Sequence, residues 1–177
     1  HYPLRRQRQM CIRDRGKYPV QAVKVMVKIV HEAEDAIDHR EVIRKHREII
    51  ERKSGDALSL SAVELASNID AVAIVAPTRS GLTARRISRF KCPQPTVAIT
   101  EDGKVARQLL VSWGVTPIPC GTLKTTEEIF RKAEEIVLKK KYGKPGDRIV
   151  VVAGSPASPK GKTDLIRVLT LAGEDFE

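Results

Sequence analysis

The chain has 177 residues, a formal net charge of +10, 41% hydrophobic residues and 4% aromatic residues. This length suffices for one domain with a real core, and a core so poor in aromatic side chains favours packed βα units over an all-β sandwich. The charge raises a nucleic-acid hypothesis. However, five arginines and one aspartate place +4 of it before Gly16, and no aromatic side chains are interleaved with base-reading arginines, so we do not expect a nucleic-acid partner.

The cysteines and the hydropathy pattern indicate a cellular location. Cys11, Cys92 and Cys120 are widely spaced and form no CxxC pair, which disfavours a zinc site and a disulfide framework and favours a reducing compartment. No apolar run reaches membrane-spanning length, and the first residues show no apolar signal core. We therefore expect a cytoplasmic protein with no membrane partner.

The N-terminal part divides into an unmatched segment and helices. Residues 1–15 are basic and lack periodicity; a nucleic-acid-binding arm is one interpretation, and a non-native or truncated start is the one we favour. Tyr18-Pro19 opens a helix with an apolar stripe from Val23 onward. A second helix is expected over residues 40–53, with a break at Ser54-Gly55-Asp56, and a short helix over residues 61–67.

Strands and helices alternate from residue 71 onward. Apolar strands are expected at residues 71–76, 96–100, 115–119, 148–153 and 164–171, and helices at residues 82–90, 104–112 and 125–139. Pro117 and Pro119 suggest an edge position for the third strand. The segment 154–162 is too short for a crossover helix, so the last strand should run antiparallel to its predecessor. The prediction is a three-layer α/β/α fold with a five-stranded, mostly parallel sheet whose last strand is antiparallel.

A turn rich in hydroxyls follows the first strand. Thr78, Ser80 and Thr83 carry hydroxyls, Arg79 is basic, and Gly81 allows a close approach of the backbone. A helix then begins, and its N-terminus favours an anion. A phosphate-binding turn is one interpretation, and an ordinary βα turn with a hydroxyl cap is the other.

A second loop, Ser155–Thr163, also follows a strand expected to be parallel, so both loops should lie at the same edge of the sheet. It carries Lys160 and Lys162 around Gly161. Together the two loops could enclose a phosphorylated ligand between hydroxyls and ammonium groups. The alternative is two solvated loops.

No catalytic constellation is evident in the sequence. His31, His39 and His46 fall on helices, away from the strand ends where open α/β sheets bind ligands. The chain has no GxSxG, no GxxxxGK[ST] and no second histidine after His31-Glu32 at metalloprotease spacing. We expect neither a catalytic residue nor a metal site in this chain.

Five segments look familiar as a set. They are Gly16–Met26 continued by His31–Glu34, then Thr78–Ala84, then Ala106–Leu109 with Trp113–Pro117, then Gly146–Gly154, and finally Thr163–Val168. In this order they resemble the C-terminal α/β domain of the pyruvate kinase family, with similarity from about Gly16 to Leu171.

The resemblance implies an organisation and a function. Residues 16–38 would be the last helix of a truncated catalytic barrel, and residues 39–177 the C-terminal α/β domain. In the family this domain binds an allosteric effector, such as a sugar phosphate or a nucleotide, and contributes to a homotetramer. Carried over, the phosphate-binding residues would be Thr78, Arg79, Ser80, Gly81 and Thr83 on the turn, and Lys160, Gly161 and Lys162 on the closing loop. Leu82 stands where the family often has Arg, which leaves the effector's identity open.

The resemblance also implies what this chain lacks. The family's catalytic lysine and arginine and its magnesium and potassium sites lie upstream of Gly16. The chain alone should therefore bind no cofactor and be inactive, while its full-length parent would use Mg and K to transfer phosphoryl from phosphoenolpyruvate to ADP in glycolysis. The alternative is a stand-alone, non-catalytic phospholigand-binding protein of the same fold.

Overall fold

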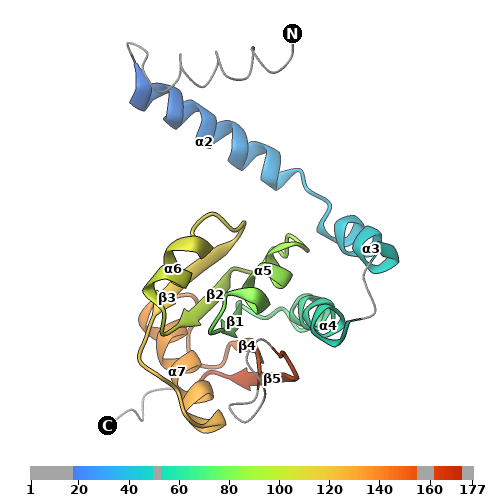
Figure 1. Ribbon diagram of the computed structural model, residues 1–177. Helices are drawn as coiled ribbons and strands as arrows, with labels where there is room; N and C mark the ends of the chain where they lie inside the picture. The colour runs from blue at the N-terminus through green and yellow to red at the C-terminus, as the bar shows by residue number, and fades with distance from the viewer. Residues whose placement is uncertain (1–17, 50–52, 155–161, 173–177) are drawn as a thin grey trace. The chain divides into compact units, whose positions relative to one another are not determined.

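The computed structural model describes residues 18–49, 53–154 and 162–172, drawn in colour in Figure 1. Within it the chain divides into two compact units between Asp38 and His39. The described residues of the first unit form the helix α2 (Pro19–Asp35), with a proline at its start. No residue of α2 is buried, and its large apolar side chains are exposed.

The second unit is built on a five-stranded sheet. Its strands are β1 (Ala73–Pro77), β2 (Thr96–Thr100), β3 (Val115–Pro119), β4 (Arg148–Ala153) and β5 (Leu165–Thr170). They lie in the order β3-β2-β1-β4-β5. The first three pairings are parallel, and β5 runs antiparallel to β4. The predicted fold is therefore confirmed, including the reversal of the last strand and the edge position of β3.

The helices of this unit are α3 (His39–Ile49), α4 (Ser54–Asn68), α5 (Leu82–Ser88), α6 (Gly103–Leu109) and α7 (Thr126–Lys139). Alternate residues of the strands point to opposite faces of the sheet. Ile74 and Val150 face the cluster that also holds side chains from α4, α5 and α6. Val75 and Val151 face the cluster that holds α7. These three layers follow from the apolar strands, which are buried on both sides.

One sequence-based boundary is wrong. Ser54, Gly55 and Asp56 do not break the helical structure: they form the first turn of α4, which extends over fifteen residues. Tertiary packing explains the difference. A Cβ on Gly55 would lie 2.3 Å from a guanidinium nitrogen of Arg86, and the Asp56 carboxylate accepts from Arg86 Nε at 3.0 Å. The Arg86 side chain of the neighbouring helix thus lies against Gly55 and pairs with Asp56, the two residues that suggest a break in the sequence.

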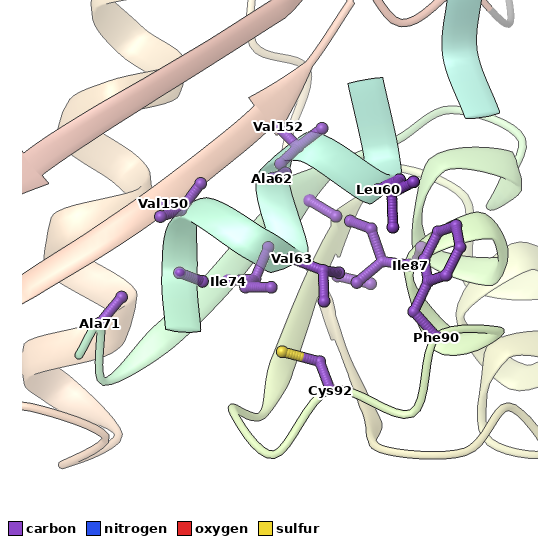
Figure 2. Packing of buried hydrophobic residues seen from close by; sticks show 14 of the residues in the cluster. Leu60, Ala62, Val63, Ala71, Ile74, Ile87, Phe90, Cys92, Val150 and Val152 are labelled. Atoms are coloured by element: carbon purple, nitrogen blue, oxygen red, sulfur yellow. The ribbon is translucent and has the colours of Figure 1, made fainter. Parts of the chain in front are cut away.

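Figure 2 shows how the α4 side of the core is packed. Val63 of α4 and Ile87 of α5 lie close to Ile74 of β1, and Phe90 lies beside Ile87. The thiol of Cys92 borders the same cluster and donates to Gln94 Oε1 at 2.7 Å. Burial raises the pKa of Cys92 from 9.0 to about 11.

The raised pKa of Cys92 predicts a loss of stability at alkaline pH. The folded state holds the thiol proton more tightly than the unfolded chain. The contribution of the protonated Cys92 thiol to the free energy of unfolding is therefore complete below pH 9 and is lost as the pH rises towards 11. The difference in free energy of unfolding between the wild type and Cys92→Ala should shrink over this interval by up to about 2–3 kcal/mol. Urea denaturation at both ends of the interval measures it. A difference that does not change with pH would contradict the prediction.

Candidate functional site

The turn after β1 is stabilised by its own first hydroxyl. Thr78 Oγ1 accepts from the backbone N–H of Gly81 at 2.9 Å, and Thr78 N–H donates to Ile99 O at 2.8 Å. Gly81 has φ = 77°, a conformation that other residues rarely adopt. A Cβ there would lie 3.2 Å from side-chain atoms of Leu109 and Val105. The turn is thus anchored to β2 and packed against α6.

The residues of the turn differ in exposure. Arg79 and Ser80 are exposed, Thr78 is half-buried, and Gly81 and Thr83 are buried. Thr78 Oγ1 already accepts a hydrogen bond inside the turn. The hydroxyl most open to a ligand is therefore that of Ser80.

A buried contact joins the turn to the end of the second loop. Thr83 Oγ1 lies 2.8 Å from Thr163 Oγ1, although eighty positions separate the two residues. Thr83 is 7% exposed and Thr163 is 1% exposed. The turn and the residue that precedes β5 therefore meet at one edge of the sheet, as the parallel pairing of β1 with β4 requires.

The ends of the second loop also lie together. The carbonyl oxygen of Lys162 would be only 2.0 Å from a Cβ on Gly154, so the backbone passes Gly154 at a distance that only glycine allows. Asp164 N–H donates to Ala153 O at 3.1 Å and starts the β4–β5 ladder. Lys162 is exposed. Lys160 and Gly161, also predicted here, lie outside the described residues.

An arginine missed by the sequence analysis borders the turn. Arg85 donates to the carbonyl oxygen of Ser80 at 3.5 Å and to Gln108 Oε1 at 3.1 Å. Both acceptors are neutral, so these contacts leave the positive charge of the guanidinium uncompensated beside the turn. The available signal was its position four residues after Gly81, where a helical side chain lies over the preceding turn.

The sequence analysis also missed a set of ion pairs that connects α5 to α4. Asp56 of α4 pairs with Arg86 at 3.0 Å and with Arg89 at 3.5 Å. Asp56 and Arg86 are largely buried, whereas Arg89 is exposed, with side-chain exposures of 9%, 16% and 60%. Removing one member of such a buried pair is strongly destabilising because the other charge is left uncompensated. The pair therefore constrains the orientation of the helix that begins at the turn.

The histidines of the second unit serve packing. His39 Nδ1 lies 2.5 Å from the carbonyl oxygen of Lys91, and the His46 ring meets Phe90 edge-on at 5.5 Å. Within the ranges that the structure describes, no three His, Cys, Asp or Glu residues cluster as metal ligands. Over the same ranges, no helix is long and apolar enough to cross a membrane.

The mixed five-stranded sheet, with helices packed on both of its faces, defines a three-layer α/β class of domain. The model of the pyruvate kinase alpha/beta domain matches residues 56–169. The chain is 35% identical over 153 residues to a pyruvate kinase of Clostridium acetobutylicum, covering 86% of this chain and 32% of that protein. For the pyruvate kinase of Geobacillus stearothermophilus the identity is 33%, covering 86% of this chain and 26% of the relative.

The chain is also 33% identical to a third relative, the pyruvate kinase of Agrobacterium vitis. That match covers 90% of this chain and 33% of the relative. The chain belongs to the pyruvate kinase family and carries its C-terminal α/β domain. It spans about a third or less of the length of these curated relatives.

Because the backbone of Lys162 passes so close to Gly154, a side chain added at Gly154 should lower the stability of the domain. Gly154→Ala should destabilise the domain by about 2 kcal/mol or more, because the added methyl group meets a backbone carbonyl that cannot rotate away. Gly121→Ala is the matched control, since a Cβ at Gly121 has no neighbour within 4 Å. Chemical denaturation measures both, and equal stabilities of the two variants would show that the passage is not tight.

Proposed function

We propose that this chain is the effector-binding and subunit-contact portion of a cytoplasmic pyruvate kinase, whose complete form transfers phosphoryl from phosphoenolpyruvate to ADP in glycolysis. Membership of the pyruvate kinase family supports the proposal that the chain is a portion of such an enzyme. The observation that carries the ligand site is the hydroxyl contact between Thr83 and Thr163. It brings the turn and the end of the second loop to the same edge of the sheet.

The proposed ligand is a phosphorylated small molecule, either a sugar phosphate or a nucleotide. Ser80 offers an exposed hydroxyl, and Arg79 and Lys162 offer exposed cationic side chains. Gly81 and Thr78 shape the turn through their hydrogen bond. Lys160 and Gly161 complete the proposed set on sequence grounds alone.

The site would depend on charge. Hydroxyl donors alone bind a phosphate weakly in water, whereas hydrogen bonds from charged groups are about twice as strong as neutral ones. Arg79, Arg85 and Lys162 supply that charge near the turn, and all three are exposed. Exposed charges are screened by salt, so the affinity should fall as ionic strength rises.

The proposed subunit contacts concern the outer edge of the sheet. Among the described residues β5 pairs with β4 on one side and with no strand on the other, and Val168 on β5 is 39% exposed. An open strand edge readily pairs with another chain. A homotetramer of the complete enzyme is the assembly we propose.

The first expected outcome is phosphate binding at the turn. Ser80→Ala should weaken the binding of a sugar phosphate or a nucleoside monophosphate by about threefold to tenfold, because one hydrogen bond to a charged group is lost. Lys162→Met should weaken it comparably. Isothermal titration at low ionic strength measures these affinities and shows which ligand class is preferred.

Ser61→Ala on α4 and Lys139→Met on α7 serve as matched controls, since both side chains are exposed and lie on helices that contribute no residue to the turn. Neither control should change the affinity. If no phosphorylated ligand binds the unaltered chain, the proposed effector site is wrong.

The second expected outcome concerns catalysis. We assign no residue of this chain to phosphoryl transfer, and among its described residues no three His, Cys, Asp or Glu side chains gather where they could hold a metal ion. The purified chain should therefore form no ATP from phosphoenolpyruvate and ADP with Mg and K supplied. A coupled assay measures this, with a complete pyruvate kinase as positive control. ATP formation above background that scales with the amount of the chain would refute the assignment.

A further inference from the structure

Two of the three threonine and serine hydroxyls of the turn are already used by the fold. Thr78 accepts from Gly81, and Thr83 bonds to Thr163. With exposures of 7% and 1%, Thr83 and Thr163 present almost no surface to a ligand in solution. Their hydroxyl pair therefore calls for a role other than direct contact with the phosphate.

We propose that the Thr83–Thr163 pair is a positioning device that holds Lys162 beside the turn. This inference rests on the proposed effector site and assigns a part in it to Thr163, which ends the second predicted loop and is not among the predicted phosphate-binding residues. Lys162 is the residue immediately before Thr163, so its Cα lies within about 3.8 Å of that of Thr163. A hydrogen bond from Thr163 to the turn thus fixes where the stem of Lys162 starts.

The backbone around Lys162 supports a fixed position. Its carbonyl oxygen passes next to Gly154, and two residues later Asp164 enters the ladder through Ala153 O. The segment 162–164 is therefore held at three successive residues, by Gly154, Thr83 and Ala153. The side chain of Lys162 is exposed, so what is fixed is its origin and not its charged end.

Preorganisation explains why this matters for affinity. A lysine whose backbone is already in place loses less conformational freedom on binding than one on an unanchored segment. The pair would raise affinity for an anion without touching it. It would do so only through Lys162, which separates this role from a general contribution to stability.

The test measures binding of inorganic phosphate by isothermal titration in Thr163→Val, Thr163→Ser, Lys162→Met and the double variant Lys162→Met/Thr163→Val. Thr163→Val should weaken binding by about threefold to tenfold, because Lys162 would then lose more conformational freedom when the phosphate binds, and Thr163→Ser should restore the affinity. In the Lys162→Met background, Thr163→Val should have no further effect, because its effect passes through that lysine.

Thr96→Val is the matched control for burial. Thr96 is 3% exposed and lies at the start of β2, the opposite end of the strand from the turn, so it should change stability but not affinity. The inference would be overturned if Thr163→Val left the affinity for phosphate unchanged, or if it lowered that affinity equally in the presence and absence of Lys162. In either case, weaker binding by Ser80→Ala would still support the proposed effector site. Absence of any phosphate binding by the unaltered chain would overturn both proposals.

Discussion

The parallel pairing of β1 with β4 is the constraint on which the candidate site depends. Ile74 lies opposite Val150 and Val75 opposite Val151, so two strands far apart in the chain end at the same edge of the sheet. All four side chains are fully buried. Successive side chains of each strand pack into the two apolar clusters on opposite faces of the sheet. A shift of the pairing by one residue would therefore exchange the side chains of the two faces. The register is thus strongly specified, and with it the meeting of the turn and Thr163, which precedes β5.

The helix that follows the turn is held from two sides. Its inner face contributes Ala84 and Ile87 to the apolar cluster, and Arg86 reaches across to Asp56 on α4. Apolar contacts have no preferred direction, whereas an ion pair does. The combination fixes both the depth and the rotation of α5. A short helix of seven residues could not be stable by propensity alone, so the geometry of the turn is a property of the whole layer.

Much of this arrangement could be predicted from the sequence, for reasons that differ by element. Continuous apolar runs predict the buried strands, and the antiparallel direction of β5 follows from a loop that is too short for a crossover. The start of α7 was predictable too, because Thr125 caps it by accepting from Glu128 N–H at 3.1 Å. These features are local, or follow from connection length.

The features that could not be predicted depend on partners distant in sequence. Gly55 and Asp56 are typical of a helix break unless Arg86 is known to lie against them. Thr83 and Thr163 are ordinary hydroxyl residues until the fold brings them within 2.8 Å. Local patterns predict which segments form elements, but they contain no information about which side chains the packing of those elements will bring together.

That distinction also changes what the turn can do chemically. In the sequence alone, the hydroxyls of Thr78, Ser80 and Thr83 are equivalent candidates for binding a phosphate. In the fold, Thr78 and Thr83 hold the turn and its neighbour in place, and Ser80 remains at the surface. A turn with so few free neutral donors would need nearby cations to hold a doubly charged group against its hydration. Arg85 contacts the carbonyl oxygen of Ser80, and Thr163, the residue after Lys162, contacts Thr83, so the fold brings two segments that are distant in sequence to the turn. Affinity for an anion would therefore depend on the integrity of the sheet edge rather than on the turn alone.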